Sequence, residues 1–262
     1  MKPKDFKLAL IQMQVEGGEK ERNIRHAVEL ITEAASNGAE VVLLPECMDL
    51  GWTHPSSQTE AEKIPEGVPC KALRQAAKQN AVYVCSGLTE KSGDRVYNSA
   101  VIIDPQGQVL CRYRKTNELD VGRTYYATGE TPVVTETKFG IIGLMICADA
   151  NAKDLSVSRA LCHKGADVIL SPASWAVPAD HDNNKNPYGN VWRNAYTSIA
   201  KEFSVPVFGA SNVGEINAGP WKGQNCIGCS LAIDTDGNEI LQGPYGANAE
   251  CILYVDVKPR RS

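Results

Sequence analysis

Apolar residues along the chain follow two alternating patterns, one typical of strands and one typical of helices. Residues 7–15 form a nearly continuous apolar run, which predicts a buried strand, and residues 40–46 form a second. Residues 20–39 between them place apolar side chains at helical spacing: Ile24, Ala27, Val28, Ile31 and Ala35. This strand-helix-strand order favours a sheet covered by helices on at least one face.

A second unit repeats the plan later in the chain. We expect a helix from Asp154, a stop at Gly165, and then a strand. The stretch "NGAEVVLLPE" (37–46) is similar to "KGADVILSPA" (164–173), and each places a proline soon after its apolar run. Two matched units predict a fold with two pseudo-symmetric halves.

Other segments indicate antiparallel pairing. Residues 100–115 and 230–244 each set two β-rich runs around a polar turn, and so predict hairpins. We also expect a polar loop over 179–187, a helix over 188–203 and a strand over 205–212. No low-complexity linker divides the chain, so residues 1–262 are interpreted as a single mixed α/β domain with parallel and antiparallel strands.

Composition narrows the functional classes. The 262 residues are 43% apolar, enough for a sizeable core, and carry a formal net charge of −4 without a long basic cluster, which argues against nucleic-acid binding. The apolar stretch near the N-terminus is too short for a signal peptide or membrane span. Nine cysteines, an odd number, fit reduced thiols in a cytoplasmic protein better than a disulfide framework.

Cys226 and Cys229 have the spacing of a zinc or redox motif. A structural zinc site usually needs four ligands, and the sequence has no second pair of this kind. We therefore expect core thiols at these positions and no metal site.

Three apolar strands end directly at a polar side chain: Glu46, Lys115 and Cys147. Ligands bind at strand ends in α/β sheets, so these three groups could meet in one pocket. A carboxylate could take the thiol proton, and the lysine with the Ala148 backbone N–H could stabilise the charge that develops when a thiolate attacks a carbonyl. Taken singly, each residue is more typical of a loop or the core; the three together favour a thiol-dependent catalyst.

These stretches, "LLPECMDLGW", "YRK" and "IIGLMICAD", resemble in kind and order the three signatures of the nitrilase, or carbon-nitrogen hydrolase, superfamily. The resemblance extends to "ILYVDV" at residues 252–257. It implies a four-layer αββα sandwich with mixed sheets, a homodimer or higher homo-oligomer, and no metal or organic cofactor. It also implies a general base at Glu46, an electrostatic stabiliser at Lys115, and a nucleophile at Cys147 that forms a thioester.

Two departures from the family pattern affect the expected substrate and site. Many members carry a second glutamate where this chain has Gly122, and Glu118, or alternatively Asp120, could take its place. The "CAD" sequence keeps an acid at the position found in amidase and N-carbamoyl hydrolase branches, which favours a small amide or ureido substrate over a nitrile. Arginines that bind a substrate carboxylate in some branches are replaced by Ala150 and Asn151.

Further residues have open interpretations. Trp52 and Trp175 could line the pocket or belong to the core, and Asp180 and Asp182 could attract a cationic substrate or be solvated loop residues. The competing functions are a nitrilase, a non-catalytic binding protein with this fold, and a papain-like hydrolase. The last would pair the cysteine with a histidine: His163 or His181.

Overall fold

Two six-stranded mixed sheets form the centre of the structure, a computed structural model that describes residues 3–260. In spatial order, the first sheet contains β15 (Cys251–Val257), β1 (Phe6–Gln12), β2 (Val41–Leu43), β3 (Tyr83–Ser92), β4 (Arg95–Ile103) and β5 (Val109–Arg114). The second contains β14 (Glu239–Gln242), β13 (Leu231–Ile233), β10 (Val207–Ser211), β8 (Val168–Ala173), β7 (Gly140–Leu144) and β6 (Val133–Thr137). A small sheet of β11 (Val213–Glu215), β12 (Asn225–Ile227) and β9 (Ala176–Val177) lies beside them.

The two large sheets have matching plans. Parallel pairs join β1, β2 and β3 in one sheet and β10, β8 and β7 in the other, and the flanking strands are antiparallel. The hairpins predicted over 100–115 and 230–244 correspond to the antiparallel pairs of β4 with β5 and of β13 with β14. The predicted mixed sheets are therefore confirmed.

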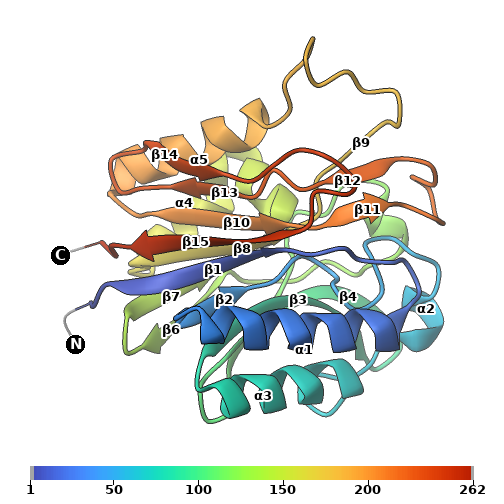
Figure 1. The fold of residues 1–262 in the computed structure, drawn as a ribbon, viewed down its shortest axis with the longest axis horizontal. Coiled ribbons are helices and arrows are strands. Elements are labelled where there is room, and N and C mark those ends of the chain that lie inside the picture. Colours follow the sequence, from blue (N-terminus) through green and yellow to red (C-terminus); the bar gives the residue numbers. More distant parts are fainter. Residues whose placement is uncertain (1–2, 261–262) are drawn as a thin grey trace.

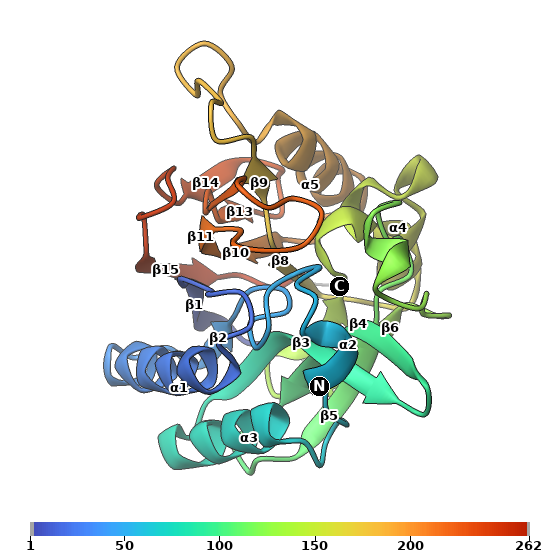
Figure 2. The same ribbon diagram turned by 90° about the vertical axis from the view of Figure 1, so that its right-hand side faces the viewer.

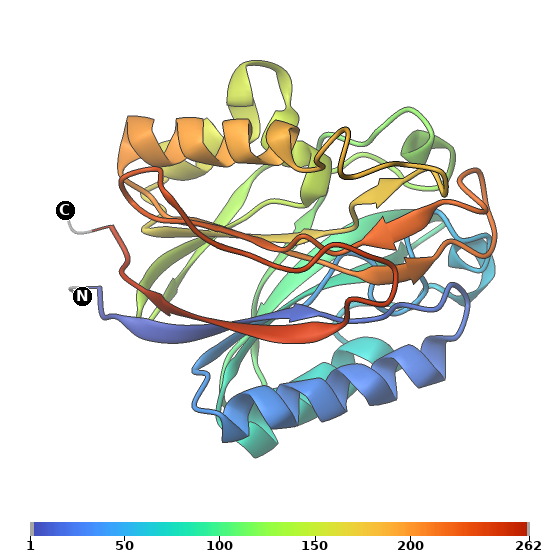
Figure 3. The same cartoon turned by 45° about the horizontal axis from the view of Figure 1, so that its top comes forward.

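Helices cover the outer face of each large sheet. They are α1 (Lys20–Ser36), α3 (Val68–Asn80), α4 (Ser156–His163) and α5 (Asn190–Phe203); the connections contain the short helix α2 (Ser57–Glu60) and the 3-10 segments η1 (Gly122–Thr124), η2 (Cys147–Asn151) and η3 (Lys153–Leu155). α1 and α3 lie along one face of the molecule and α4 and α5 along the opposite face, with the sheets between them (Figures 1 and 3). This arrangement is the predicted αββα sandwich.

Strand alternation explains why both faces of the first sheet are apolar. In β1, Leu8 and Leu10 belong to the core between the sheets, whereas Ala9 and Ile11 belong to the core beneath α1 and α3. Burying such a side chain contributes about 1.5–3 kcal/mol, so a strand buried on both faces is strongly fixed in place.

Two of the predicted helices are shorter in the structure than the sequence indicated. The first helix ends at Ser36, and α4 begins at Ser156, two residues after the predicted start. The loop between β9 and α5 forms no helix or strand, as predicted, and projects from the body of the molecule (Figure 2). No helix among residues 3–260 combines the length and apolar character needed to cross a membrane.

Candidate active site

Glu46 lies where the carboxyl ends of the two sheets meet. It follows β2, is 1% exposed, and its backbone N–H donates to the Ala173 carbonyl at the end of β8, at 3.2 Å. A Cβ atom at Gly87 would lie 2.5 Å from the Glu46 Cα, so only glycine on β3 permits this turn to pack so closely. The backbone thus holds the carboxylate between the sheets.

The Glu46 carboxylate accepts two short hydrogen bonds. Lys115 Nζ donates to Oε1 at 2.7 Å, and Asn98 Nδ2 on β4 donates to the same oxygen at 2.6 Å. Lys115 is 1% exposed, and its backbone is fixed by bonds to Asn98 and Gly129. Burial by itself disfavours the ammonium, but the carboxylates of Glu118 and Glu46 outweigh it and raise the pKa of Lys115 well above its ordinary value. Lys115 is therefore a fixed positive charge at neutral pH.

Cys147 stands at a sharp turn three residues after β7. Its φ of 46° lies in the left-handed region, which is uncommon for a residue with a side chain and is found often at functional sites. Burial and the Glu46 carboxylate, to which the thiol is hydrogen-bonded, raise the pKa of Cys147 well above its ordinary value, although Lys115 opposes them. At rest the thiol keeps its proton next to a base.

Asp149 connects the turn at Cys147 to the loop after Lys115. One carboxylate oxygen accepts bonds of 2.8 Å from the Ile146 N–H and the Tyr113 hydroxyl, and the other accepts the Asn117 N–H at 2.8 Å. Asn117 in turn donates to the Ala148 carbonyl at 2.6 Å. This fully buried acid thus fixes Cys147 and Lys115 relative to each other.

The structure separates the two candidates for the second carboxylate. Glu118 is buried and its Oε2 lies 3.6 Å from Lys115 Nζ, whereas the side chain of Asp120 is exposed and pairs with Arg123. A Cβ at Gly122 would lie 2.5 Å from Glu118 Oε2 and 3.3 Å from Trp52. The Glu118 carboxylate therefore fills the space that a side chain at position 122 would need.

The pH dependence of stability provides a test of this placement. Burial and the nearby Glu46 outweigh Lys115 and raise the pKa of Glu118 from 4.5 to about 7, so the folded carboxyl binds its proton more tightly than the unfolded one. Its contribution to stability is full below pH 4.5 and is lost as the pH rises through about 7. When the pH rises from 5 to 8, the wild-type protein should lose roughly 2–3 kcal/mol of unfolding free energy through Glu118, and the Glu118→Gln variant, which has no proton to lose there, should not. The difference in unfolding free energy between variant and wild type should therefore shift by that amount in favour of the variant. Urea denaturation of both proteins at the two pH values checks this, and a constant difference would contradict it.

A cavity of about 60 Å³ adjoins these groups. It is lined by Glu46, Trp52, Lys115, Leu119, Cys147, Ser174, Trp175, Ala176, Tyr188, Trp192 and Trp221. The structure thus brings the three predicted strand-end residues together, with both predicted tryptophans beside them.

Several other predicted candidates lie outside this cavity. The ring of His163 packs against Phe203, and that of His181 lies near Tyr245. Asp180 is exposed and Asp182 pairs with Lys185, in agreement with solvated loop residues. Cys226 and Cys229 are buried free thiols, and no cluster of three or more metal-type ligands occurs among residues 3–260.

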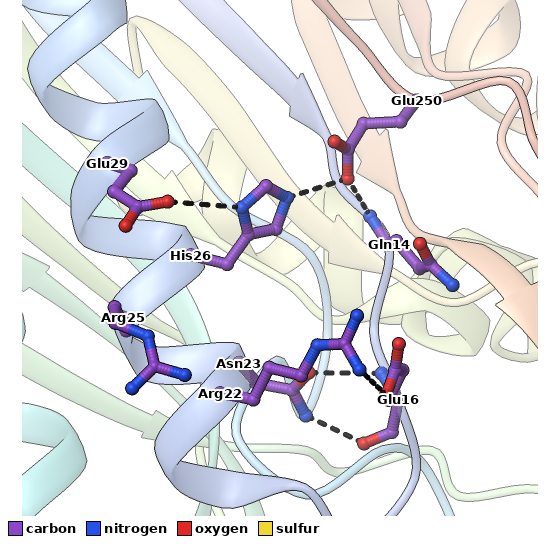
Figure 4. A pocket seen from close by; sticks show the side chains of 8 residues that line it. All are labelled: Gln14, Glu16, Arg22, Asn23, Arg25, His26, Glu29 and Glu250. Carbon is purple, nitrogen blue, oxygen red and sulfur yellow. Dashed lines mark hydrogen bonds and ion pairs between the residues drawn. The ribbon is translucent and has the colours of Figure 1, made fainter.

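A larger hollow, of about 240 Å³, lies between α1, the chain after β1, and Glu250 (Figure 4). Its charges satisfy one another: His26 lies between Glu250 and Glu29, and Arg22 pairs with Glu16. It contains neither a thiol nor any of the three strand-end residues. The smaller cavity is therefore the candidate active site.

Sequence reasoning did not identify Asn98, Tyr188, Trp192 or Trp221. Asn98 lies in the middle of a strand, without a local signal. Trp192 and Tyr188 lie at the start of α5 and before it, and Trp221 lies in the loop before β12. Their approach to Cys147 depends on tertiary packing; the only sequence signal was that aromatic residues gather at binding sites.

The family profile described as carbon-nitrogen hydrolase matches residues 7–261. The chain is 36% identical over 176 residues to a protein of Pyrococcus abyssi described as a nitrilase, covering 66% of this chain and 66% of that protein. It is 32% identical over 191 residues to the chloroplastic omega-amidase of Arabidopsis thaliana, covering 65% of this chain and 52% of the relative. The matches thus span about half to two thirds of these relatives.

The structure of Nit3 from Saccharomyces cerevisiae, described as a member of branch 10 of the nitrilase superfamily, has the same fold. It superposes with a TM-score of 0.82 at 21% identity, covering 98% of this chain and 92% of that chain. The αββα arrangement of the present chain is therefore that of a solved nitrilase-superfamily structure.

Proposed function

Because this chain belongs to the carbon-nitrogen hydrolase family, we propose that it hydrolyses the C–N bond of a small amide through a thioester on Cys147. The observation that carries the proposal is that the Cys147 thiol, the Glu46 carboxylate and the Lys115 ammonium line one cavity, with Glu46 bonded to Lys115. The description of a relative as an omega-amidase supports an amide substrate. The proposed steps use only side chains, backbone and water, so they require no metal or organic cofactor.

In the first half of the reaction, Glu46 accepts the Cys147 proton as the sulfur attacks the amide carbonyl carbon. The negative charge that develops on the carbonyl oxygen is stabilised by Lys115 Nζ and by the Ala148 N–H. Glu46 then gives the proton to the leaving nitrogen, the C–N bond breaks, and ammonia leaves behind a Cys147 thioester. Since the ammonium charge of Lys115 is already in place, little reorganisation is needed.

In the second half, Glu46 takes a proton from a water molecule, and the resulting hydroxide attacks the thioester carbon. The C–S bond breaks, the acid is released, and Cys147 recovers its proton from Glu46. A carbamoyl substrate would follow the same steps to ammonia and a carbamic acid, whose remaining C–N bond then breaks to give an amine and carbon dioxide. Glu118, 3.6 Å from Lys115 Nζ, would hold that ammonium in position throughout.

Ammonia release tests the proposal. Purified protein is incubated with short aliphatic amides, ω-amides of dicarboxylates, N-carbamoyl amines, N-carbamoyl amino acids and nitriles, with a Cys147→Ala protein as control. Cys147-dependent release from amides or carbamoyl compounds supports an amidase or carbamoyl hydrolase. Release from nitriles alone would favour a nitrilase, as the Pyrococcus relative is described. Silence across the panel would favour a non-catalytic binding protein.

A double variant, His163→Ala with His181→Ala, separates this mechanism from a papain-like one. Neither histidine lines the cavity at Cys147, so we expect kcat/KM within about threefold of wild type. Steady-state kinetics of the folded variant check this expectation. Near-complete loss of activity would mean that a histidine, and not Glu46, activates the thiol.

The family resemblance and the composition support three further proposals. We propose that the chain forms one catalytic domain and assembles as a homodimer or higher homo-oligomer. We also propose a cytoplasmic location, because all nine cysteines are free thiols, which fits a reducing compartment.

A further inference from the structure

All four tryptophans of the sequence line the cavity that contains Cys147. They come from separate parts of the chain: the turn after Glu46, the connection between β8 and β9, the first turn of α5 and the loop before β12. Trp52 and Trp175 are buried, and Trp192 and Trp221 are partly buried at the rim. Because no tryptophan lies elsewhere, indole rings are concentrated at this one place.

The rings form two contacting pairs. Trp175 and Trp192 stack with centroids 5.0 Å apart and planes 17° from parallel, and Trp52 meets Trp221 edge to face at 4.8 Å. Trp192 Nε1 donates to the Tyr188 hydroxyl at 2.9 Å, which fixes the orientation of its ring. Such pairs hold one another in place. The cavity walls are therefore preformed, flat and apolar.

The charged side chains in this cavity already form an ion pair with each other. Among the described residues that line it, Glu46 is the one acidic side chain and Lys115 the one basic side chain. The lining contains neither arginine nor histidine. The Lys115 ammonium already contacts two carboxylates, Glu46 at 2.7 Å and Glu118 at 3.6 Å. A carboxylate on the substrate would lose its solvation among indole rings without gaining a free counter-ion. It would also lie near the negative charge of Glu46.

The cavity volume of about 60 Å³ also limits the substrate. An apolar cavity of about 150 Å³ can hold a benzene molecule, so this smaller cavity has room for an acyl group of only a few carbon atoms. Building on the proposed amidase function, we infer that the substrate is a short, uncharged aliphatic amide whose acyl chain packs among the four tryptophans. The same argument excludes ω-amides that carry a free carboxylate, in contrast to the activity named for the Arabidopsis relative.

A matched pair of substrates tests this inference. Butyramide and succinamate share the same chain, but succinamate carries a carboxylate where butyramide has a methyl group. We expect kcat/KM to be at least about 100-fold higher for butyramide, because only the acid loses solvation without gaining a partner. If succinamate were hydrolysed as fast as butyramide in a Cys147-dependent way, the hydrolase would stand and the inference would be overturned.

Binding can be measured without turnover. Since every tryptophan lines the cavity, intrinsic fluorescence of the Cys147→Ala protein should change on titration with butyramide, and succinamate should need a concentration at least about 100-fold higher. Preferential binding of succinamate would overturn the inference. If wild type hydrolysed no amide while butyramide still bound, the proposed reaction would fail but the ligand class would stand.

A change at the rim tests whether charge is the reason for the selectivity. Trp221 is partly exposed in a loop, so Trp221→Arg can place a guanidinium at the cavity, and Trp221→Leu serves as the control that removes the ring without adding charge. We expect the arginine variant to hydrolyse succinamate at least about tenfold faster than the leucine variant. Equal rates in the two folded variants would show that charge does not exclude the acid, and would overturn the inference.

Discussion

Replacing Cys147 by alanine is expected to lower the rate of ammonia release from the substrate by at least about 10⁴-fold, because no other group in the cavity can form the thioester. The side chain is 6% exposed, so alanine removes one buried sulfur atom and leaves the surrounding backbone bonds in place. Asp149 and Asn117 continue to hold the turn, since the bonds that they make to it go to the Ile146 N–H and the Ala148 carbonyl and not to the sulfur. The variant should therefore fold while losing turnover.

Steady-state ammonia assays with the best substrate of the panel, together with circular dichroism, check this expectation. Cys162→Ala provides a matched control, because Cys162 is also buried but lies on α4 outside the cavity. It should keep nearly wild-type activity. A folded Cys147→Ala protein with wild-type turnover would end the thioester mechanism, and equal losses in both variants would indicate a general packing defect.

The convergence of Glu46, Lys115 and Cys147 could be predicted because each ends an apolar run with its own local signature. The positions of strand ends follow from apolar periodicity, and parallel strands bring their carboxyl ends to one edge of a sheet. The contact of the Glu46 N–H with the Ala173 carbonyl joins the matched units that the sequence similarity of 37–46 and 164–173 indicated. Here local pattern and tertiary structure agree.

Other features of the site and fold could not be predicted, or were not, from the local sequence. Asn98 is one of several polar residues on β4, next to Ser99, and its bond to Glu46 exists only because β4 lies opposite the turn after β2. The sequence favoured Glu118 over Asp120 because it lies nearer to Lys115, and in the loop after β5 only Glu118 is buried beside that lysine. The helix α3 was overlooked although Cys70, Leu73, Ala76 and Ala77 follow helical spacing. The contacts of Asn98 and Glu118 arise from packing between elements distant in sequence, whereas the signal for α3 is local and was present in the sequence.

Changing Lys115 to methionine is expected to lower both activity and stability. Turnover should fall by at least about 10³-fold, because the ammonium that faces the developing oxyanion is lost. Glu46 and Glu118 would remain buried without their common partner, and breaking a buried pair in this way costs about 3–5 kcal/mol. Urea denaturation and ammonia assays at pH 8 measure the two effects.

A second substitution separates these effects. Adding Glu118→Gln to Lys115→Met removes one of the two uncompensated carboxylates, so part of the lost stability should return at pH 8 while turnover stays low. The gain should be smaller at pH 5, because burial raises the pKa of Glu118 to about 7 even beside Lys115, and the loss of that ammonium raises it further, so Glu118 is already protonated there. Recovery of turnover together with stability would contradict the role of Lys115 in the reaction. Equal unfolding free energies of the single and double variants at pH 8 would instead contradict the charge contact of Glu118 with Lys115. If that contact exists, its loss leaves Glu118 as an unpaired buried carboxylate that lowers the stability of the single variant.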